Sequence, residues 1–184
     1  MPHAPLAGSS ATRLLEFREK LTALIQPEGS SQPFRVVKSS GGAAGGVVSE
    51  GQGYGLLLAG VTLSTQTPGS TAYRATLSFA EELFSGWRRM AELSKGSCQD
   101  DPTLRCGGHR KREGEMAKGF APCLPSWAFD DTLRAQRGSG SASDGDEDAI
   151  LGLVLLLQSS SAEHWPLWDR ALSWTYETVR AFLR

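Results

Sequence analysis

The strongest constraint on this chain is a run in which one glutamate is followed by three alternating glycines. Residues 48–59 read Val-Ser-Glu-Gly-Gln-Gly-Tyr-Gly-Leu-Leu-Leu-Ala, so Glu50 stands directly before Gly51, Gly53 and Gly55. Glycine lets another part of a molecule come close to the backbone, but each glycine in a helix costs about 1 kcal/mol relative to alanine. Three such destabilising glycines beside one acid are expected to belong to a functional site.

The composition fits a single domain with a substantial core. The chain has 184 residues, of which 40% are hydrophobic, and a formal net charge of -1. This charge argues against a nucleic-acid partner held by net charge. No apolar run reaches the roughly 18 residues of a membrane span, so no membrane partner is expected. Residues 1–11 show neither the basic nor the apolar region of a signal peptide, and the sequence leaves the compartment open.

A polar, charge-rich stretch at residues 95–123 contains all three cysteines, and we interpret it as a surface insertion. The cysteines are Cys98, Cys106 and Cys123. An odd number allows at most one disulfide within the chain. Together with His109 the cysteines also allow a zinc site, but their spacing matches no paired Cys-x-x-Cys arrangement. We therefore expect neither a metal nor another cofactor.

Hydrophobic periodicity predicts a mostly α-helical chain. The expected helices cover residues 12–26, 71–93 and 166–183, and two further helices begin at Ser49 and Ser143. Residues 34–37 are expected to form a short extended piece, and residues 127–134 a short helical or irregular link. No strongly alternating strand pattern is present.

Two of these helices begin with an acid in or near the first turn. Ser49 followed by Gln52 forms a capping-box pattern, and Ser143 is expected to cap the helix that begins beside Asp144. If the two helices pack side by side, Glu50 and Asp144 share one end of the bundle. Paired carboxylates at a cleft are the catalytic groups typical of glycoside hydrolysis, in which one acid protonates the leaving oxygen.

At these residues the sequence resembles glycoside hydrolase family 8. The family's Ser-Glu-Gly-Gln-Gly-Tyr-Gly block is matched without a break over residues 49–55, and its Ala-Ser/Thr-Asp-Ala/Gly-Asp block over residues 142–146. Phe-Ser-Gly-Trp at 84–87 and Leu-Pro-Ser-Trp at 124–127 are similar to two further landmarks, in the family's order. The match extends over most of residues 34–157.

The resemblance implies an (α/α)6 barrel and inverting hydrolysis of β-1,4-linked polysaccharides such as cellulose, xylan, chitosan or mixed-linkage glucan. It implies that Glu50 is the general acid and that Asp144 holds and distorts the sugar beside the scissile bond. Trp127 is expected to stack on a sugar, because an aromatic ring suits the apolar face of a pyranose. The other substrate-binding residues that it implies are Gln52, Tyr54 and Asp146.

The chain departs from the family's pattern in four places. The second block continues as Asp148-Ala149-Ile150 instead of Asp-Ile/Met-Ala, the next aromatic is delayed to Trp165, and residues 95–123 lengthen the gap between the acids. The expected helices also supply only about the first half of a six-hairpin barrel, as one partial domain over residues 1–184. The family's general base lies in the other half, so no residue is assigned that role.

Simpler interpretations exist for the same residues. Without its neighbours Glu50 would be an ordinary charge at a helix end, and Asp144 and Asp146 would be capping acids. Trp87 and Trp174 are expected in the core rather than as sugar platforms. For the whole chain, the alternative to a hydrolase is a remnant that binds glycan or folds poorly, because half of a toroid leaves apolar helix faces uncovered.

The general-acid role sets a physical condition on Glu50, which must be protonated before it reacts. The N-terminus of a helix favours the anion by about 0.3 to 1 kcal/mol. Burial and a neighbouring carboxylate act in the opposite direction. Asp144 is the expected neighbour, so the hypothesis requires the two acids to lie close together in a cleft that substrate covers.

Overall fold

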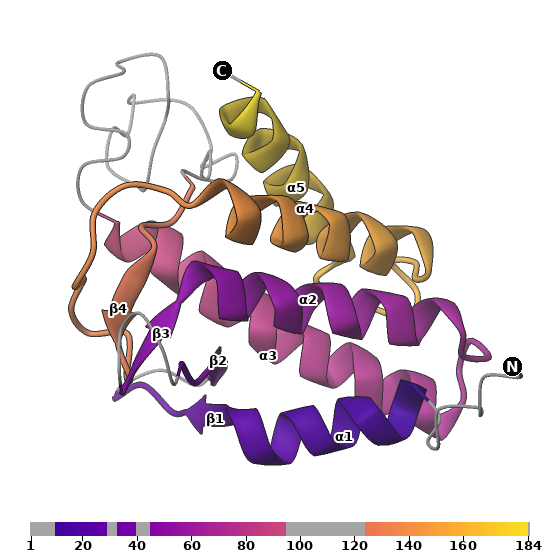
Figure 1. Ribbon diagram of the computed structural model, residues 1–184. Coiled ribbons are helices and arrows are strands. Elements are labelled where there is room, and N and C mark those ends of the chain that lie inside the picture. The colour runs from indigo at the N-terminus through magenta and orange to yellow at the C-terminus, as the bar shows by residue number, and fades with distance from the viewer. Residues whose placement is uncertain (1–9, 29–32, 40–44, 95–123, 184) are drawn as a thin grey trace, which may run out of the picture.

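The computed structural model describes residues 10–28, 33–39, 45–94 and 124–183 (Figure 1). The helices are α1 (Ser10–Leu21), α2 (Ser49–Ser64), α3 (Thr71–Leu93), α4 (Ser143–Gln158) and α5 (Trp168–Phe182). The strands are β1 (Thr22–Ile25), β2 (Phe34–Val37), β3 (Gly46–Val48) and β4 (Ala128–Asp130). The described part is therefore mostly helical, as predicted, and the expectation of an all-α chain is corrected by two small antiparallel sheets, β1-β2 and β3-β4. The proposed insertion, with its cysteines and His109, lies outside the described residues.

The helices α2 and α4 run side by side in the same direction, and α3 runs the opposite way beside α2 (Figure 1). The hydroxyl of Tyr73, in the first turn of α3, donates to the carbonyl oxygen of Ser159 just after α4, at 2.9 Å. This bond ties the start of α3 to the end of α4. The starts of α2 and α4 consequently lie together at the opposite end of the bundle.

Glycines allow α2 and α4 to touch backbone to backbone. A Cβ atom on Gly53 would lie 2.4 Å from the carbonyl oxygen of Gly145, and one on Gly60 would lie 2.7 Å from the carbonyl oxygen of Gly152. In each helix the two glycines are seven residues apart, so they lie on one face, two turns from each other. The glycines that destabilise α2 as an isolated helix are thus the ones that bring α4 against it.

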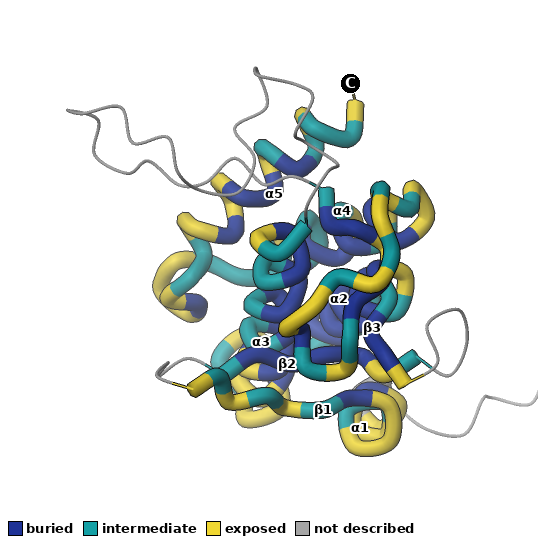
Figure 2. The backbone as a smooth tube through the Cα atoms, turned by 90° about the vertical axis from the view of Figure 1, so that its left-hand side faces the viewer, coloured by how far each residue is buried: buried dark blue, intermediate teal, exposed yellow. Residues whose placement is uncertain are grey.

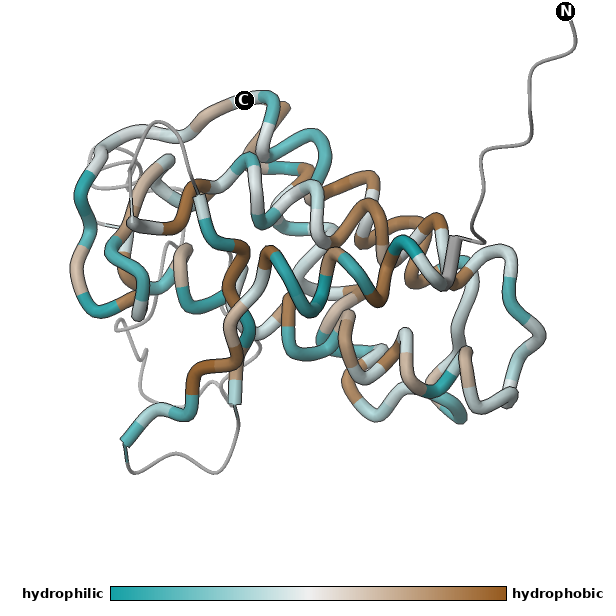
Figure 3. The backbone as a smooth tube through the Cα atoms, turned by 60° about the horizontal axis from the view of Figure 1, so that its bottom comes forward, coloured by the Kyte–Doolittle hydropathy of each residue, from teal (hydrophilic) through white to brown (hydrophobic). Residues whose placement is uncertain are grey.

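The core lies on α3 and the helices around it, as the dark tube in Figure 2 shows. The predicted stripe of α3 is buried, namely Ala80, Leu83, Trp87 and Met90. Trp174 of α5 is also buried and meets Phe84 edge to face, with ring centroids 6.2 Å apart. The core assignment of Trp87 and Trp174 is therefore confirmed. Hydrophobic and hydrophilic stretches alternate along the helices (Figure 3), as expected when one side of each helix is buried.

The prediction of one helix over residues 12–26 is wrong in its last part. The helix α1 ends at Leu21, and residues 22–25 form β1, which pairs with β2 in the register Thr22 to Val37 and Ile25 to Phe34. The Thr22 hydroxyl donates a hydrogen bond to the carbonyl oxygen of Arg18, one turn earlier, at 2.6 Å. A helical pattern of apolar residues could not reveal this change, because the partner strand lies further along the sequence.

The expected link at residues 127–134 contains a strand instead of a helix. The strand β4 pairs with β3, with Val48 opposite Ala128 and Gly46 opposite Asp130. Because β3 leads directly into α2, this pairing places the segment around β4 at the start of α2. In the part of the chain that the structure describes, no helix is both long enough and apolar enough to cross a membrane.

We predict that Gly53→Ala lowers the free energy of unfolding by about 1 to 3 kcal/mol, the usual cost of overpacking. The added methyl group would meet the carbonyl oxygen of Gly145 at 2.4 Å, and this backbone atom moves only if the helix moves. The matched control is Gly51→Ala, whose nearest contact is a methyl group of Val37 at 3.3 Å. Chemical denaturation of both variants measures the difference, and equal stability would contradict the proposed backbone contact.

Candidate active site

The two acid blocks meet at the first turns of α2 and α4. A Cβ atom on Gly145 would lie 2.6 Å from the backbone nitrogen of Glu50 and 2.8 Å from the carbonyl carbon of Ser49. Gly145 directly follows Asp144, so the backbone beside one acid touches the backbone of the other. The prediction that the two acids share one end of the bundle is confirmed.

The predicted serine caps are wrong. The N-cap residues are Val48 for α2 and Ala142 for α4, both extended, and neither helix has a side-chain cap. Ser49 is already in the first turn of α2, where its backbone N–H donates to the carbonyl oxygen of Trp127 at 3.0 Å. The β3-β4 pairing therefore organises the start of α2 in place of a capping box, and the Ser49 hydroxyl is buried without a hydrogen-bond partner.

Four of the predicted site residues lie on the surface at this end. Glu50 and Asp144 are both exposed, Tyr54 is 52% exposed and Trp127 is 37% exposed. Glu50 and Tyr54 are four residues apart on α2, so their side chains occupy the same helix face one turn from each other. The arrangement combines two carboxylates with two accessible aromatic rings.

The same face continues along both helices as exposed apolar side chains. Val61 of α2, seven residues after Tyr54, is 44% exposed, and Leu151 of α4, seven residues after Asp144, is 50% exposed. A seven-residue spacing keeps each of these on the side of the helix that carries the site residue. The acids thus lie at one end of a surface that is apolar further along.

The Trp127 ring is held by its own hairpin. A Cβ atom on Gly138 would lie 2.3 Å from the indole ring, so the ring rests on this glycine. The backbone N–H of Trp127 donates to the carbonyl oxygen of Gly140 at 2.9 Å. One side of the ring is therefore supported, and its exposed part lies next to the start of α2.

The Asp130 carboxylate organises the turn that follows β4. It accepts hydrogen bonds from the backbone N–H groups of Thr132, Arg134 and Ala135, at 3.2, 2.8 and 2.9 Å. Burial raises the pKa of this carboxyl, but the hydrogen bonds outweigh burial and leave the pKa below its ordinary value. Asp130 was not predicted as a site residue, and neither was Gly138. The Asp-Asp-Thr sequence after a short apolar segment is a turn signal that could have identified Asp130.

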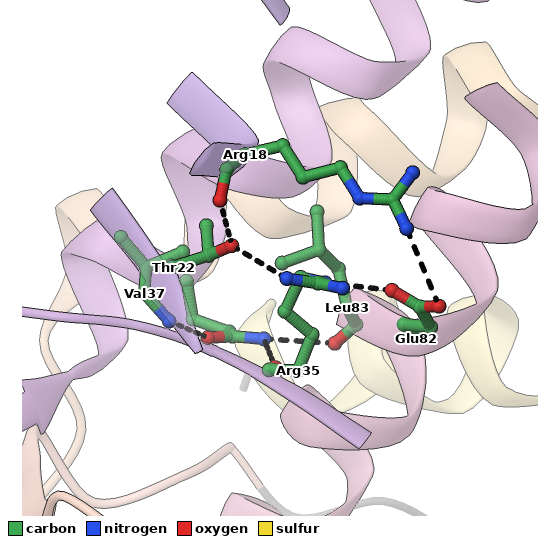
Figure 4. Close-up of polar contacts among 7 residues, drawn as sticks. Arg18, Thr22, Arg35, Val37, Glu82 and Leu83 are labelled. Atoms are coloured by element: carbon green, nitrogen blue, oxygen red, sulfur yellow. Dashed lines mark hydrogen bonds and ion pairs between the residues drawn. The ribbon is translucent and has the colours of Figure 1, made fainter. Parts of the chain in front are cut away.

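Gln52 is completely buried, and both the oxygen and the nitrogen of its side-chain amide form hydrogen bonds to backbone groups. The side-chain oxygen accepts from the N–H of Val37 at 3.0 Å, and the side-chain nitrogen donates to the carbonyl oxygens of Arg35 at 2.8 Å and Leu83 at 2.9 Å (Figure 4). Because it bonds to both Val37 and Arg35, the amide takes the place of a neighbouring strand along the free edge of β2. This position does not support the predicted substrate-binding role of Gln52 and makes it part of the scaffold beneath the site.

An ion pair extends the same network. The Arg35 guanidinium donates to the carboxylate of Glu82 at 2.6 Å and to the hydroxyl of Thr22 at 2.9 Å, and Arg18 lies 3.8 Å from the same carboxylate (Figure 4). Arg35 is only 7% exposed. A buried charge of this kind is tolerated only with a well-aligned partner, so β2 is held firmly to α3.

Asp146 is the most perturbed acid at the junction. It is 0% exposed, and neither carboxyl oxygen has a hydrogen-bond partner among the residues that the structure describes. Burial, together with the negative charge of Asp144, raises its pKa to about 7. Asp144 and Asp146 are two residues apart, about 200° around a helix, so one faces solvent and the other faces the interior. Asp146 therefore does not share the exposed surface with the other predicted site residues.

Among the described residues, no group of three or more His, Cys, Asp and Glu side chains is placed to hold a metal ion. No protein-family model matches the chain, and no curated protein matches it at a significant level.

We expect Gln52→Leu to lower the free energy of unfolding by about 3 kcal/mol. The substitution keeps the approximate size of the side chain but leaves the N–H of Val37 and the carbonyl oxygens of Arg35 and Leu83 without this partner, at about 1 to 3 kcal/mol for a buried unpaired group. The control is Gln158→Leu at the exposed end of α4, which should change stability by less than about 0.5 kcal/mol. Urea denaturation tests both variants, and a loss no larger than that of the control would exclude the scaffold role.

Asp146 is expected to make stability fall as the pH rises. Because its pKa in the folded state, about 7, lies above the ordinary value of 3.8, the folded state binds this proton more tightly than the unfolded state. The stabilisation is complete below about pH 4 and is lost as the pH rises through 7, by at most about 4 kcal/mol at about 1.4 kcal/mol per tenfold difference in proton affinity. Asp146→Asn should therefore be more stable than the wild type at pH 8 and equally stable at pH 4. Thermal unfolding at the two pH values would refute this if the variant gains nothing at pH 8.

Proposed function

We propose that this chain is part of a glycoside hydrolase that cleaves β-1,4-linked polysaccharides with Glu50 as the general acid. The observation that carries the proposal is the backbone contact of Gly145 with Glu50, which brings the two acid blocks together at one exposed end of the bundle. The two blocks are 87 residues apart at their nearest ends, Gly55 and Ala142, and the acids Glu50 and Asp144 are 94 residues apart, so sequence proximity does not explain their meeting.

In the proposed reaction, Glu50 gives its proton to the oxygen of the departing sugar. Its exposed position lets a polysaccharide reach it, and the bound polysaccharide would then cover the carboxyl and favour the protonated form. Asp144 would hold the sugar beside the scissile bond through its hydroxyl groups. Tyr54 and Trp127 would stack on neighbouring sugar rings.

The proposed architecture is about half of an (α/α)6 barrel. It is supported by the parallel packing of α2 and α4, with α3 antiparallel beside α2, which is compatible with successive helical hairpins (Figure 1). It is also supported by the exposed apolar side chains of Val61 and Leu151, since further helices of a barrel would cover them. A general base for the attacking water is not assigned to any described residue.

Glycan binding without hydrolysis is the second candidate function. The exposed Tyr54 and Trp127 rings favour it, because sugar stacking needs no base to activate water. The two candidates differ in what the acids do. Hydrolysis requires the proton of Glu50, whereas binding alone requires mainly the aromatic surface.

We expect Glu50→Gln to reduce the release of reducing sugar from soluble β-glucan, xylan or chitosan by about 10²- to 10⁴-fold, the usual contribution of a general acid. The amide cannot donate a proton with comparable strength. Asp144→Asn should also reduce activity, whereas Glu147→Gln, an exposed acid in the same turn of α4, should not.

Affinity electrophoresis in gels that contain the same polysaccharides separates the two functions. A chain that is retarded but releases no sugar, and loses retardation in Trp127→Ala, would favour glycan binding. A chain that neither binds nor cleaves any of the three polysaccharides would overturn both candidates.

A further inference from the structure

A carboxyl group without a partner lies at the interface beneath the two exposed acids. Asp146 is completely buried in the first turn of α4, where its backbone N–H donates to the carbonyl oxygen of Ala142 at 3.1 Å. The residue before it, Gly145, touches the backbone of Glu50, and the next residue towards the N-terminus is Asp144. A movement of the Asp146 backbone out of the interior would therefore also move the Gly145 contact that brings the two acids together.

Among the described residues, no cation pairs with this carboxyl group. The helices α2 and α4 carry no basic residue, and their other charged residues are Glu50, Asp144, Glu147 and Asp148. The strand β3 has no charged residue, and the Asp130 carboxylate of β4 is occupied by backbone N–H groups. The cations on the neighbouring turn and on α5 are all exposed, namely Arg134, Arg137, Arg170 and Arg180.

In the part of the chain that the structure describes, no hydroxyl group donates to the Asp146 carboxyl group. The hydroxyl groups of Ser49 and Ser126 are also buried with no partner among these residues, and their two segments meet where the N–H of Ser49 donates to the carbonyl oxygen of Trp127. A buried carboxylate without a hydrogen bond or a cation is far less favourable than the neutral acid.

We propose that Asp146 is a positioning residue of the acid pair: only while its buried carboxyl group is uncharged can the first turns of α2 and α4 stay in contact at Gly145 and place Glu50 and Asp144 at the same substrate. This inference rests on the function proposed above. When Asp146 ionises, it places a second negative charge two residues from Asp144 in a region that is not exposed to solvent. The structure relieves this cost by turning the carboxylate outwards, which separates Gly145 from Glu50.

The first test measures the ionisation of Asp146 and the hydrogen exchange around it, and it does not depend on activity. Carbon-13 NMR of the aspartate carboxyl groups should show Asp146 titrating near neutral pH in the wild-type chain. Amide hydrogen exchange in residues 50–53 and 144–147 should become faster as the pH rises from 6 to 8, beyond the intrinsic pH dependence of exchange. The Asp146→Asn variant should show only that intrinsic dependence, because its side chain cannot ionise.

The second test measures the pH profile of polysaccharide hydrolysis. For a group with a pKa of about 7, the neutral fraction falls about tenfold between pH 6 and pH 8, so the wild-type rate should fall by at least that factor. Asp146→Asn should recover about tenfold of the loss at pH 8, whereas the control Glu147→Gln should follow the wild type. A residue that only stabilises the fold would not change the profile below the unfolding temperature.

The outcomes separate this inference from the proposed function. If the chain hydrolyses polysaccharide but Asp146→Asn has the wild-type pH profile, the positioning role is wrong and the hydrolase stands. If no hydrolysis is found, the NMR titration and the exchange rates still decide the role of Asp146 at the helix junction. An Asp146 carboxyl that titrates near pH 4 in the folded wild type would overturn the inference directly, even if the variant does not fold.

Discussion

The structure depends on the contact in which the glycines of α2 and α4 meet backbone to backbone. Ordinary side chains keep helix axes about 8 to 10 Å apart. Gly53 and Gly60 on one helix, and Gly145 and Gly152 on the other, remove the side chains that would prevent a closer approach. This contact decides where the exposed acids lie, because Glu50 is in the first turn of α2, Asp144 is in the first turn of α4, and the two turns are adjacent.

A second set of contacts fixes the other side of α2. The Gln52 amide joins β2 to α2 and α3, and the Arg35–Glu82 ion pair joins β2 to α3 again. These interactions are polar and buried, so their geometry is more restrictive than that of an apolar contact. The helix that carries Glu50 is consequently held on one face by glycine packing and on another by a hydrogen-bonded strand.

The long periodic elements could be predicted from the sequence because their stripes are local. The helix α3 has the bounds expected from its pattern, and the starts of α2 and α4 follow from the acid blocks. Of the strands, β2 was expected as an extended piece at residues 34–37, and the others could not be predicted in the same way. Residues 22–25 continue the apolar pattern of α1, and only the pairing with β2 makes them a strand. Strand pairing is a long-range property, and a short strand has too few residues to show a period of its own.

The meeting of the two acid blocks was predicted correctly, whereas the contacts of Ser49 and Gln52 were not. The glycine-rich block predicts that another group comes close to the backbone, but it does not identify that group. The same glycines would suit a ligand or another helix. Ser49 was assigned to capping because that is the commonest use of serine before a helix. The β3-β4 pairing prevents this capping, because Val48 becomes the N-cap residue and the Ser49 N–H donates to the carbonyl oxygen of Trp127. Gln52 was predicted to bind substrate, but its amide instead forms hydrogen bonds to backbone groups that are distant in the sequence.

The two aspartates of α4 show how one helical turn can give two carboxyl groups opposite properties. Asp144 faces solvent, whereas Asp146, on the other side of the helix, is completely buried. Burial and the charge of Asp144 raise the pKa of Asp146. The close approach of α2 and α4 therefore brings Glu50 and Asp144 to one exposed end of the bundle, beside a buried third acid. A substitution that widened this contact would hydrate Asp146 and separate the pair in one step, so the geometry of the site and the protonation of its interior are not independent.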